Sequence, residues 1–416
     1  MSITETTSPI GHNRGGEVEI TYHDFLRTGP GTIGGRYLRS FWQPIYRSQD
    51  IEKGRAKPVK IMSEDFMIFR GESGKVYVTE PRCAHRGAKL SIGWVQGDEI
   101  QCAYHGWFYD GATGQCTKQP AEPRPFCDKV KIRTYPAREY LGLVFAYLGE
   151  GEPPEFPRAR EFETDKYFAW LTVDIWPANY WAQLENSIDY AHTEFLHWHF
   201  HFKTPSKINV EETEYGVKVF VPGLSDTADH YDTMYLTMPN THEWAGPPGK
   251  DPTMGNFARS WRIPLDDEHH IRFDYRMYPF GDKDDPKFRE KVTGRTGMRP
   301  IGETAKVVEK ILSGQLDFKT IKENPDIAPG MGFLTTVQDC AVQASLGPMA
   351  TREHKEMLGQ TDLAIAHLRR MWKEELTAFA NGRPLRDWKR PDSLWPALDG
   401  LEAKGQRHAA PGEAVP

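Results

Sequence analysis

The segment CAHRGAKL, residues 83–90, and the segment CAYHGWFYD, residues 102–110, carry the ligand types of a metal site at similar offsets. The ligand-type side chains are Cys83, His85, Cys102 and His105. Their spacing is Cys-x-His, then sixteen residues, then Cys-x2-His. Each segment therefore offers one thiolate and one imidazole, close enough for two adjoining loops to hold one metal site.

Two kinds of metal site compete for this pattern. Zinc takes mixed cysteine and histidine ligands in a closed tetrahedron, but its chelating pairs usually hold one residue type, as in Cys-x2-Cys. A Rieske [2Fe-2S] cluster has two cysteines on one iron and two histidines on the other. Because each segment offers one of each type, the pattern favours the cluster. Gly87 and Gly106 agree with it, since backbone packed around a cluster must tolerate close approach and positive φ.

Both segments resemble the metal loops of ring-hydroxylating oxygenases, including the pairs Arg86-Gly87 and Gly106-Trp107 that follow the histidines. Rieske proteins of respiratory chains are similar, but each of their loops carries an additional cysteine and the two are linked as a disulfide. Residues 86–88 and 103–104 include no cysteine here. The resemblance is therefore to the low-potential oxygenase and ferredoxin branch.

Length and composition limit what surrounds such a cluster. With 416 residues, 38% of them hydrophobic, the chain predicts two domains. The net charge of −6 is spread over both signs, so we expect no nucleic acid and no anionic membrane as partner. The remaining cysteines are interpreted as ordinary structural thiols of a reducing compartment: Cys116, Cys127 and Cys340. Without an apolar leader or span, a soluble, cytoplasmic protein is expected.

Composition shifts along the chain predict its organisation. Residues 1–20 read as a flexible tail, residues 21–155 as the cluster domain, and the proline-rich segment EGEPPEFPRA as the boundary. Residues 156–400 follow as a second domain, and residues 401–416 as a disordered tail. Within the second domain, helical spacing predicts helices over 179–197, 302–314 and 362–382. Short alternating runs predict strands between 208 and 280.

A second candidate site lies in ENSIDYAHTEFLH, residues 185–197. Asp189 precedes His192 by three residues, so the two lie side by side on a helix. His192 and His197 are five residues apart, and they converge on one metal only if the helix bulges or ends between them. Two histidines and one carboxylate form the facial triad that binds iron(II) and leaves positions open for dioxygen.

Nearly the whole chain resembles the α subunit of Rieske non-haem iron oxygenases, within the phthalate-dioxygenase-like group built from α subunits alone. The matching segments include both metal loops, residues 185–197 and VQDCAVQASLGPMATREHKEMLGQTDLAIAHLRR, residues 337–370. The likeness implies an α+β fold, with an N-terminal all-β Rieske domain and a C-terminal helix-grip (START-like) catalytic domain on an antiparallel sheet. It also implies the mononuclear iron ligands, which are His192, His197 and Asp339.

By the same likeness, Asp189 bridges His192 to the cluster-ligating His105 of a neighbouring subunit in a head-to-tail homotrimer, and Asn186 assists that network. Metal-bound histidines usually donate their free ring N–H to such a carboxylate. Some alternatives stay open. Gln338 and Asp362 are rivals of Asp339, and the alternating His199 and His201 predict an extended segment that competes with His197.

The resemblance implies a terminal oxygenase that uses O2. NAD(P)H would act indirectly, through a separate reductase or ferredoxin, since the chain has no glycine-rich dinucleotide motif. Ring dihydroxylation and monooxygenation with O- or N-demethylation of a small, aromatic substrate are all compatible with it. A carboxylated substrate needs an internal cation, for which Arg259, Arg262 and Arg272 are candidates, although each is equally a strand-surface residue. The alternative function is electron transfer by the Rieske cluster without oxygenase activity.

Overall fold

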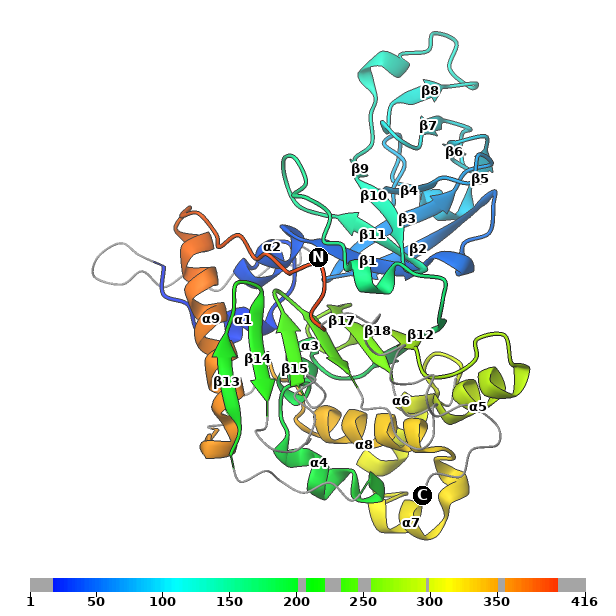
Figure 1. Cartoon of the computed structure of the whole chain (residues 1–416). Helices are drawn as coiled ribbons and strands as arrows, with labels where there is room; N and C mark the ends of the chain where they lie inside the picture. Colours follow the sequence, from blue (N-terminus) through cyan, green and yellow to red (C-terminus); the bar gives the residue numbers. More distant parts are fainter. Residues whose placement is uncertain are drawn as a thin grey trace.

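The computed structural model describes residues 18–200, 207–220, 233–245, 256–296, 299–350 and 356–395. Residues 1–17 of the expected N-terminal tail and all of the expected tail 401–416 lie outside this part. Figure 1 shows a strand-rich upper part and a lower part in which helices cover one large sheet. The predicted α+β fold is thereby confirmed.

Three antiparallel sheets form the upper part (Figure 1). The first contains β1 (Trp42–Arg47), β11 (Leu143–Tyr147) and β10 (Ala137–Tyr140). The second contains β2 (Arg55–Ile61), β3 (Glu64–Arg70), β4 (Val76–Thr79) and β9 (Thr134–Tyr135). The third contains β5 (Trp94–Gln96), β6 (Glu99–Gln101), β7 (Phe108–Asp110) and β8 (Cys116–Lys118). One metal segment follows β4, and the other joins β6 to β7.

A seven-stranded antiparallel sheet forms the lower part, as the resemblance implied. Its order is β12 (Phe168–Trp176), β18 (His270–Tyr278), β17 (Phe257–Pro264), β16 (Thr241–Ala245), β15 (Thr233–Thr237), β14 (Gly216–Phe220) and β13 (Asn209–Glu212). β12 and β13 are therefore its edges. Consecutive strands pair throughout the run from β13 to β18, so short connections suffice.

The helices are α1 (His23–Leu26), α2 (Ile33–Arg39), α3 (Tyr180–Asn186), α4 (Ala191–Leu196), α5 (Pro286–Thr296), α6 (Glu303–Leu312), α7 (Phe318–Glu323), α8 (Met331–Ser345) and α9 (Leu363–Ala380). In Figure 1, α6 and α8 lie below the sheet and α9 runs along the β13 edge. α6 and α9 are the helices predicted over 302–314 and 362–382. No helix in the described part of the chain has the length and apolar character of a membrane span.

The prediction of one continuous helix over 179–197 is wrong, because the chain breaks between α3 and α4. Asp189 lies in this break, and its carboxylate accepts a hydrogen bond from the N–H of Ala191 at 2.7 Å. A side-chain acceptor of this kind competes with the helical pattern and starts a new helix. The break sets the direction of α4, and with it the position of His192.

Strand register places charged side chains on the sheet face that α6 covers. Arg272 pairs with both Asp174 and Arg262, and in the next row of that face Asp274 pairs with Ser260. The Thr304 hydroxyl of α6 donates to the Asp174 carboxylate at 2.5 Å, which identifies this as the helix-facing side. The layer between sheet and helices is therefore polar, which is unusual for a core whose only role is packing.

Arg390 ties the C-terminal segment to the opposite face of the sheet. Its guanidinium lies 2.7 Å from Glu243 and 2.5 Å from Glu161, and its side chain is only 4% exposed. Burial opposes ionisation of Glu243, but Arg259 and Arg390 outweigh burial and lower its pKa to about 2. Arg390 is thus the counter-ion of two buried carboxylates.

Arg390→Met is expected to lower the free energy of unfolding by about 3–5 kcal/mol, because it leaves buried carboxylates without their cation. Urea unfolding followed by tryptophan fluorescence measures the change. Arg160→Met is the control, since Arg160 is 65% exposed and its ion pair within the described part of the chain is with the exposed Asp392. Equal losses in the two variants would contradict the structural role of Arg390.

Candidate metal centres

Two loops with the same backbone frame present the Cys-x-His and Cys-x2-His segments. In the first, the N–H of Cys83 donates to the carbonyl of Ala88, and the N–H of Gly87 donates to the carbonyl of Cys83, both at 2.9 Å. The second repeats these bonds: Cys102 to Trp107 at 2.8 Å, and Gly106 to Cys102 at 3.1 Å. Gly87 and Gly106 have φ of +73° and +72°, which explains both glycines.

The four predicted cluster residues converge at the upper end of the molecule. Cys83 and Cys102 are buried in one apolar cluster, and the rings of His85 and His105 lie 4.6 Å apart. Trp107 stacks on His85 with ring centroids 4.5 Å apart and thereby orients it. The Nδ1 atom of His105 is buried without a hydrogen-bond partner, as expected of a nitrogen that coordinates a metal.

The electrostatics of this site fit a metal cluster. Burial raises the pKa of the Cys83 thiol, and the neighbouring Cys102 adds to that rise. Two buried thiolates side by side therefore need a cationic partner, which irons supply. The Tyr109 hydroxyl accepts from the N–H of Ala84 at 3.2 Å and lies 3.1 Å from the Cys83 sulfur, so its own hydrogen is free to donate to that sulfur.

The second site forms where α4 meets α8. His192 lies on α4, His197 is the residue at which α4 ends, and Asp339 lies in the middle of α8. One ligand atom from each of the three lies within 4.8 Å of the others. The Nε2 atoms of His197 and His192 lie 3.1 Å and 3.7 Å from Oδ1 of Asp339. The five-residue spacing works because His197 has left the helix.

A hydrogen bond orients the His197 ring toward Asp339, and a carboxylate lies beside the His192 ring, whose Nδ1 makes no hydrogen bond. Oδ2 of Asp189 lies 3.2 Å from Nδ1 of His192, and Oε1 of the buried Gln338 lies 2.9 Å from Nδ1 of His197. With Nδ1 protonated, each ring turns its Nε2 lone pair toward the shared centre. Gln338, a rival ligand of Asp339 in the sequence, is thus placed behind His197 as an orienting group.

The surroundings of the Asp339 carboxylate suit a metal ion. Its Oδ1 is buried and has no hydrogen bond, although two ring nitrogens point toward it. A buried carboxylate oxygen that faces two lone pairs without hydrogen bonds is matched by a cation at their centre, and the two-histidine, one-carboxylate set suits iron(II).

The other candidates from the sequence fall outside this triad. The amide of Asn186 lies 3.3 Å from Nε2 of His192, at the rim of the site. His199 belongs to a 3-10 turn, which contradicts the extended segment predicted there, and its Nε2 lies 3.1 Å from the Thr335 hydroxyl. His201 lies outside the described residues. Asp362 caps a surface turn before α9, where its carboxylate accepts from the N–H of Gly359.

The three arginines proposed as internal cations are buried, so their reading as strand-surface residues is wrong. Each already has a carboxylate: Arg259 pairs with Glu243, and Arg262 and Arg272 both pair with Asp274. None of them is left without an anionic partner. The pairings depend on strand register, which the sequence alone does not give.

Two buried histidines of the helix-facing layer were missed by sequence reasoning, and His270 is one of them. Its Nδ1 lies 2.7 Å from the Ala178 carbonyl and its Nε2 2.6 Å from the Gln183 amide. Burial lowers the pKa of His270 to about 3, even though the bond to Ala178 favours the charged form. Burial likewise lowers the pKa of His242 to about 3. Both rings are therefore neutral in the folded protein.

The free energy of unfolding is accordingly expected to fall as the pH drops from about 6.5 toward 3. In this range both histidines are protonated in the unfolded chain but stay neutral in the folded protein. Each neutral ring contributes a slope of about 1.4 kcal/mol per pH unit in this window. His270→Gln is expected to flatten the dependence, measured as urea midpoints at several pH values. His269→Gln, at a half-exposed ring, is the control. An unchanged slope in His270→Gln would contradict this account.

Comparison with known proteins identifies the upper part. Residues 41–136 match the family model of the Rieske [2Fe-2S] domain. The cluster is therefore a [2Fe-2S] cluster, and the zinc alternative is not supported.

Whole-chain comparisons extend the likeness. The chain is 32% identical over 255 residues to the 5,5'-dehydrodivanillate O-demethylase oxygenase subunit of Sphingobium sp., with 58% of each chain aligned and so less than two thirds of that relative. It is 33% identical to the tert-butanol monooxygenase / tert-amyl alcohol desaturase oxygenase subunit of Aquincola tertiaricarbonis, over 70% of this chain and 69% of that one. A third relative, the 3-chlorobenzoate-3,4-dioxygenase oxygenase subunit of Comamonas testosteroni, is 28% identical over 86% and 89% of the two chains.

Solved structures agree on the fold. NdmA of Pseudomonas putida CBB5, in a mutant form with theobromine, superposes with a TM-score of 0.61 at 20% identity, over 85% of this chain and 98% of that one. The expected family is thus confirmed by sequence, and the fold by structure. The chain belongs to the oxygenase subunits of the Rieske non-haem iron oxygenases.

Proposed function

We propose that the chain is a terminal oxygenase that holds one Rieske cluster and one mononuclear iron(II), and that oxidises a small, aromatic substrate with O2. Electrons come from a separate NAD(P)H-dependent reductase, directly or through a ferredoxin. The observation that carries the proposal is the convergence of His192, His197 and Asp339 on one point, with a carboxylate oxygen that has no hydrogen bond. An electron carrier has no use for this second site.

The roles of the residues follow from the geometry. Cys83 and Cys102 would bind one iron of the cluster, and His85 and His105 the other. When bound, the cluster supplies single electrons and the mononuclear iron brings dioxygen to the substrate. Gln338 accepts the Nδ1 proton of His197, and the Asp189 carboxylate lies 3.2 Å from Nδ1 of His192. Asn186 would assist this network, since its amide lies 3.3 Å from Nε2 of His192.

The assembly follows from the positions of the two sites. β5–β8, which flank the cluster loops, lie at the top of Figure 1, whereas α4 lies at the bottom. Electron transfer within one chain would have to cross the whole molecule, so a homotrimer that brings a second copy's cluster loops beside Asp189 is the proposed unit. Exposed apolar side chains at both ends support it: Tyr104 is 57% exposed at the cluster loops, and Phe195 is 74% exposed beside His192.

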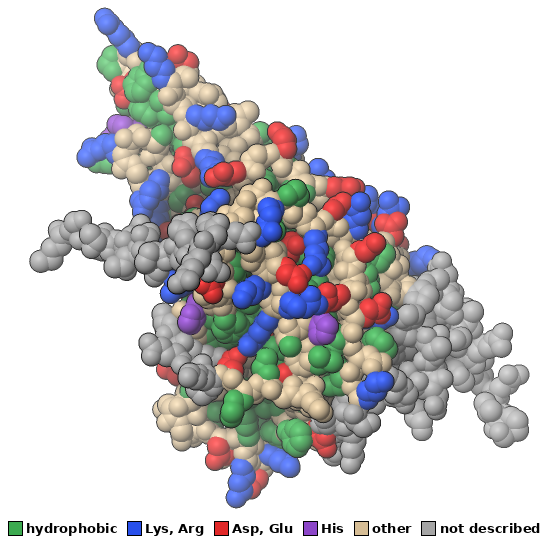
Figure 2. Space-filling view, turned by 90° about the vertical axis from the view of Figure 1, so that its left-hand side faces the viewer, with side chains coloured by type: hydrophobic (Ala, Val, Ile, Leu, Met, Phe, Trp, Pro, Cys, Tyr) green, Lys and Arg blue, Asp and Glu red, His purple; other side chains and the backbone are tan. Residues whose placement is uncertain are grey.

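Charge at the cluster end supports a docking role as well. Figure 2 shows Lys and Arg side chains around apolar ones at the narrow upper end of the molecule. Arg86 lies over the ring of Tyr104 at 5.5 Å, which combines both kinds of surface in one place. We assign residues 21–155 to the cluster domain and residues 156–400 to the catalytic domain. We place the protein in the cytoplasm, where the thiols of Cys116, Cys127 and Cys340 remain reduced.

Metal and sulfide analysis of anaerobically purified protein tests the proposed function. We expect about three irons and two acid-labile sulfides per chain, with the low-average g signal of a histidine-ligated cluster after reduction. Two irons, with no third after reconstitution with iron(II), would make the protein an electron carrier instead. Zinc without sulfide would overturn both functions.

A further inference from the structure

A cavity of about 370 Å³ opens between the β12 edge of the sheet and the helices α6 and α8. Apolar side chains, among them Val173, Ile301 and Phe333, line part of it. Its volume is in the range of small-molecule sites and accommodates a single substituted ring. No sequence motif pointed to it, because its walls come from five separate segments.

The cavity lies within reach of the candidate iron site. Thr336 lines it and precedes Asp339 by three residues on α8, which is one turn, or about 4.5 Å along the helix axis. Arg272 also lines it, from the sheet side. A molecule in this cavity therefore extends along α8 toward the proposed iron.

Positive charge exceeds negative charge in the lining. The charged side chains are Arg47, Arg272, Arg276, Arg299, Asp174 and Asp274. Both aspartates already have their donors. Asp274 pairs with Arg262 and Arg272, while Asp174 accepts from the Trp176 indole, the Thr304 hydroxyl and the Gly302 N–H.

Arg47 pairs with Asp50 at 2.7 Å, so Arg276 and Arg299 are the cations of the lining that remain. Arg276 is half-buried on the helix-facing side of β18, has no ion pair among the described residues, and makes one aromatic contact, 5.8 Å from the Trp244 ring centroid. Arg299 lies 5.0 Å from the ring centroid of Phe333 and reaches only the Pro329 carbonyl, at 3.5 Å. A half-buried guanidinium without a carboxylate, such as that of Arg276, is matched by an anionic ligand, and the exposed Arg299 lines the same cavity.

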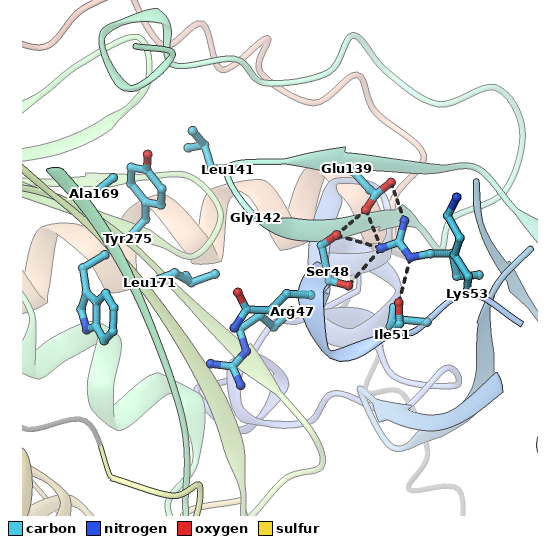
Figure 3. Close-up of a pocket in the computed structure, with 13 residues that line it drawn as sticks. Arg47, Ser48, Ile51, Lys53, Glu139, Leu141, Gly142, Ala169, Leu171 and Tyr275 are labelled. Atoms are coloured by element: carbon cyan, nitrogen blue, oxygen red, sulfur yellow. Dashed lines mark hydrogen bonds and ion pairs between the residues drawn. The ribbon is translucent and has the colours of Figure 1, made fainter. Parts of the chain in front are cut away.

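A larger cavity of about 790 Å³ lies at the junction with the upper part, and the arginine in its wall already has its hydrogen-bond partners. Figure 3 shows Glu139 and Ser48 in its wall with their hydrogen bonds. There the Arg70 guanidinium is fully used, by Glu139 at 2.8 Å, by Ser48 at 2.9 Å and by the Ile51 carbonyl at 2.8 Å. That cavity also lies away from both metal sites, so it carries no comparable argument.

We infer that Arg276 and Arg299 are specificity-determining residues that bind the carboxylate of an aromatic acid, with its ring in this cavity and its far edge directed along α8 toward Asp339. The inference rests on the proposed function for the identity of the reaction, and it names the substrate class. The carboxylate binds the planar guanidinium forks, while Phe333 and Val173 contact the ring.

Binding without turnover tests the inference. Isothermal titration of the purified protein, without reductase, compares benzoate, phenylacetate and phenoxyacetate with their neutral amides. At least one acid is expected to bind about 10- to 100-fold more tightly than its amide. Arg276→Gln should abolish that preference and leave amide binding unchanged, whereas Arg276→Lys should retain part of it because the charge remains.

Arg55→Gln is the matched control, since Arg55 is 71% exposed and lies outside the cavity. The inference is overturned if no acid is preferred over its amide, or if Arg276→Gln keeps the wild-type preference. Its failure is distinct from failure of the proposed function. A third iron per chain without acid preference removes only the cavity assignment, and acid preference without that iron removes only the oxygenase.

Discussion

Asp339→Ala is expected to remove the mononuclear iron while leaving the Rieske cluster in place. The variant loses the only negative charge in the triad, and two neutral imidazoles hold iron(II) weakly without it. Iron should fall from about three to about two per chain with sulfide unchanged at about two, and oxygen consumption coupled to NADH should be lost. The visible absorption of the cluster reports that the upper part is intact.

Asp326→Ala is the control for this variant, because Asp326 is an exposed acid shortly before α8. It should retain the third iron and full turnover. Retention of the third iron in Asp339→Ala would show that the triad is not the iron site, and attention would turn to the region around His199, Thr335 and Asn186.

Asp189→Asn is expected to keep both metal sites and to lose turnover by roughly 10- to 100-fold or more. Asp189 contacts Nδ1 of His192, not the Nε2 that faces the metal, so the ligand atom is untouched. The carboxylate accepts a hydrogen bond from the Ala191 N–H and lies 3.2 Å from Nδ1 of His192. An amide oxygen accepts that hydrogen bond as well, but the amide carries no negative charge toward the neighbouring copy.

Two measurements separate the bridging role of Asp189 from a structural one. Metal content should equal that of the wild type, while the reduced cluster should be reoxidised slowly by dioxygen in the presence of substrate. Wild-type reoxidation in Asp189→Asn would exclude the bridge. Loss of iron would show that Asp189 acts by positioning His192 alone.

The cluster loops were the easiest part to predict, because four ligands and two glycines lie within 24 residues and each loop is locally determined. The pair His192 and His197 was harder, since its geometry depends on a helix break that Asp189 creates. Asp339 was predicted from the family resemblance alone, because residue spacing gives no link between α4 and α8. Only the tertiary fold brings Asp339 close to the two histidines.

The charged layer on the sheet could not be derived because partners across strands depend on register. One signal was present: β18 alternates Arg272, Asp274 and Arg276 with apolar residues, in a segment that is otherwise typical of a buried strand. Charges at every second position indicate a second, polar interior face. Which of these arginines lacks a carboxylate was not visible, and the candidates chosen from sequence were the paired ones.

The backbone hydrogen bonds that the two cluster loops share make the number of residues in each loop a stricter requirement than the identity of their side chains. In each loop three residues separate the cysteine from the glycine, and two backbone hydrogen bonds close the ring that they form. A changed side chain at Ala84 or Ala103 leaves those bonds in place, whereas one inserted residue breaks both. Loop libraries built on this scaffold should therefore vary side chains freely at these two positions and never vary the number of residues.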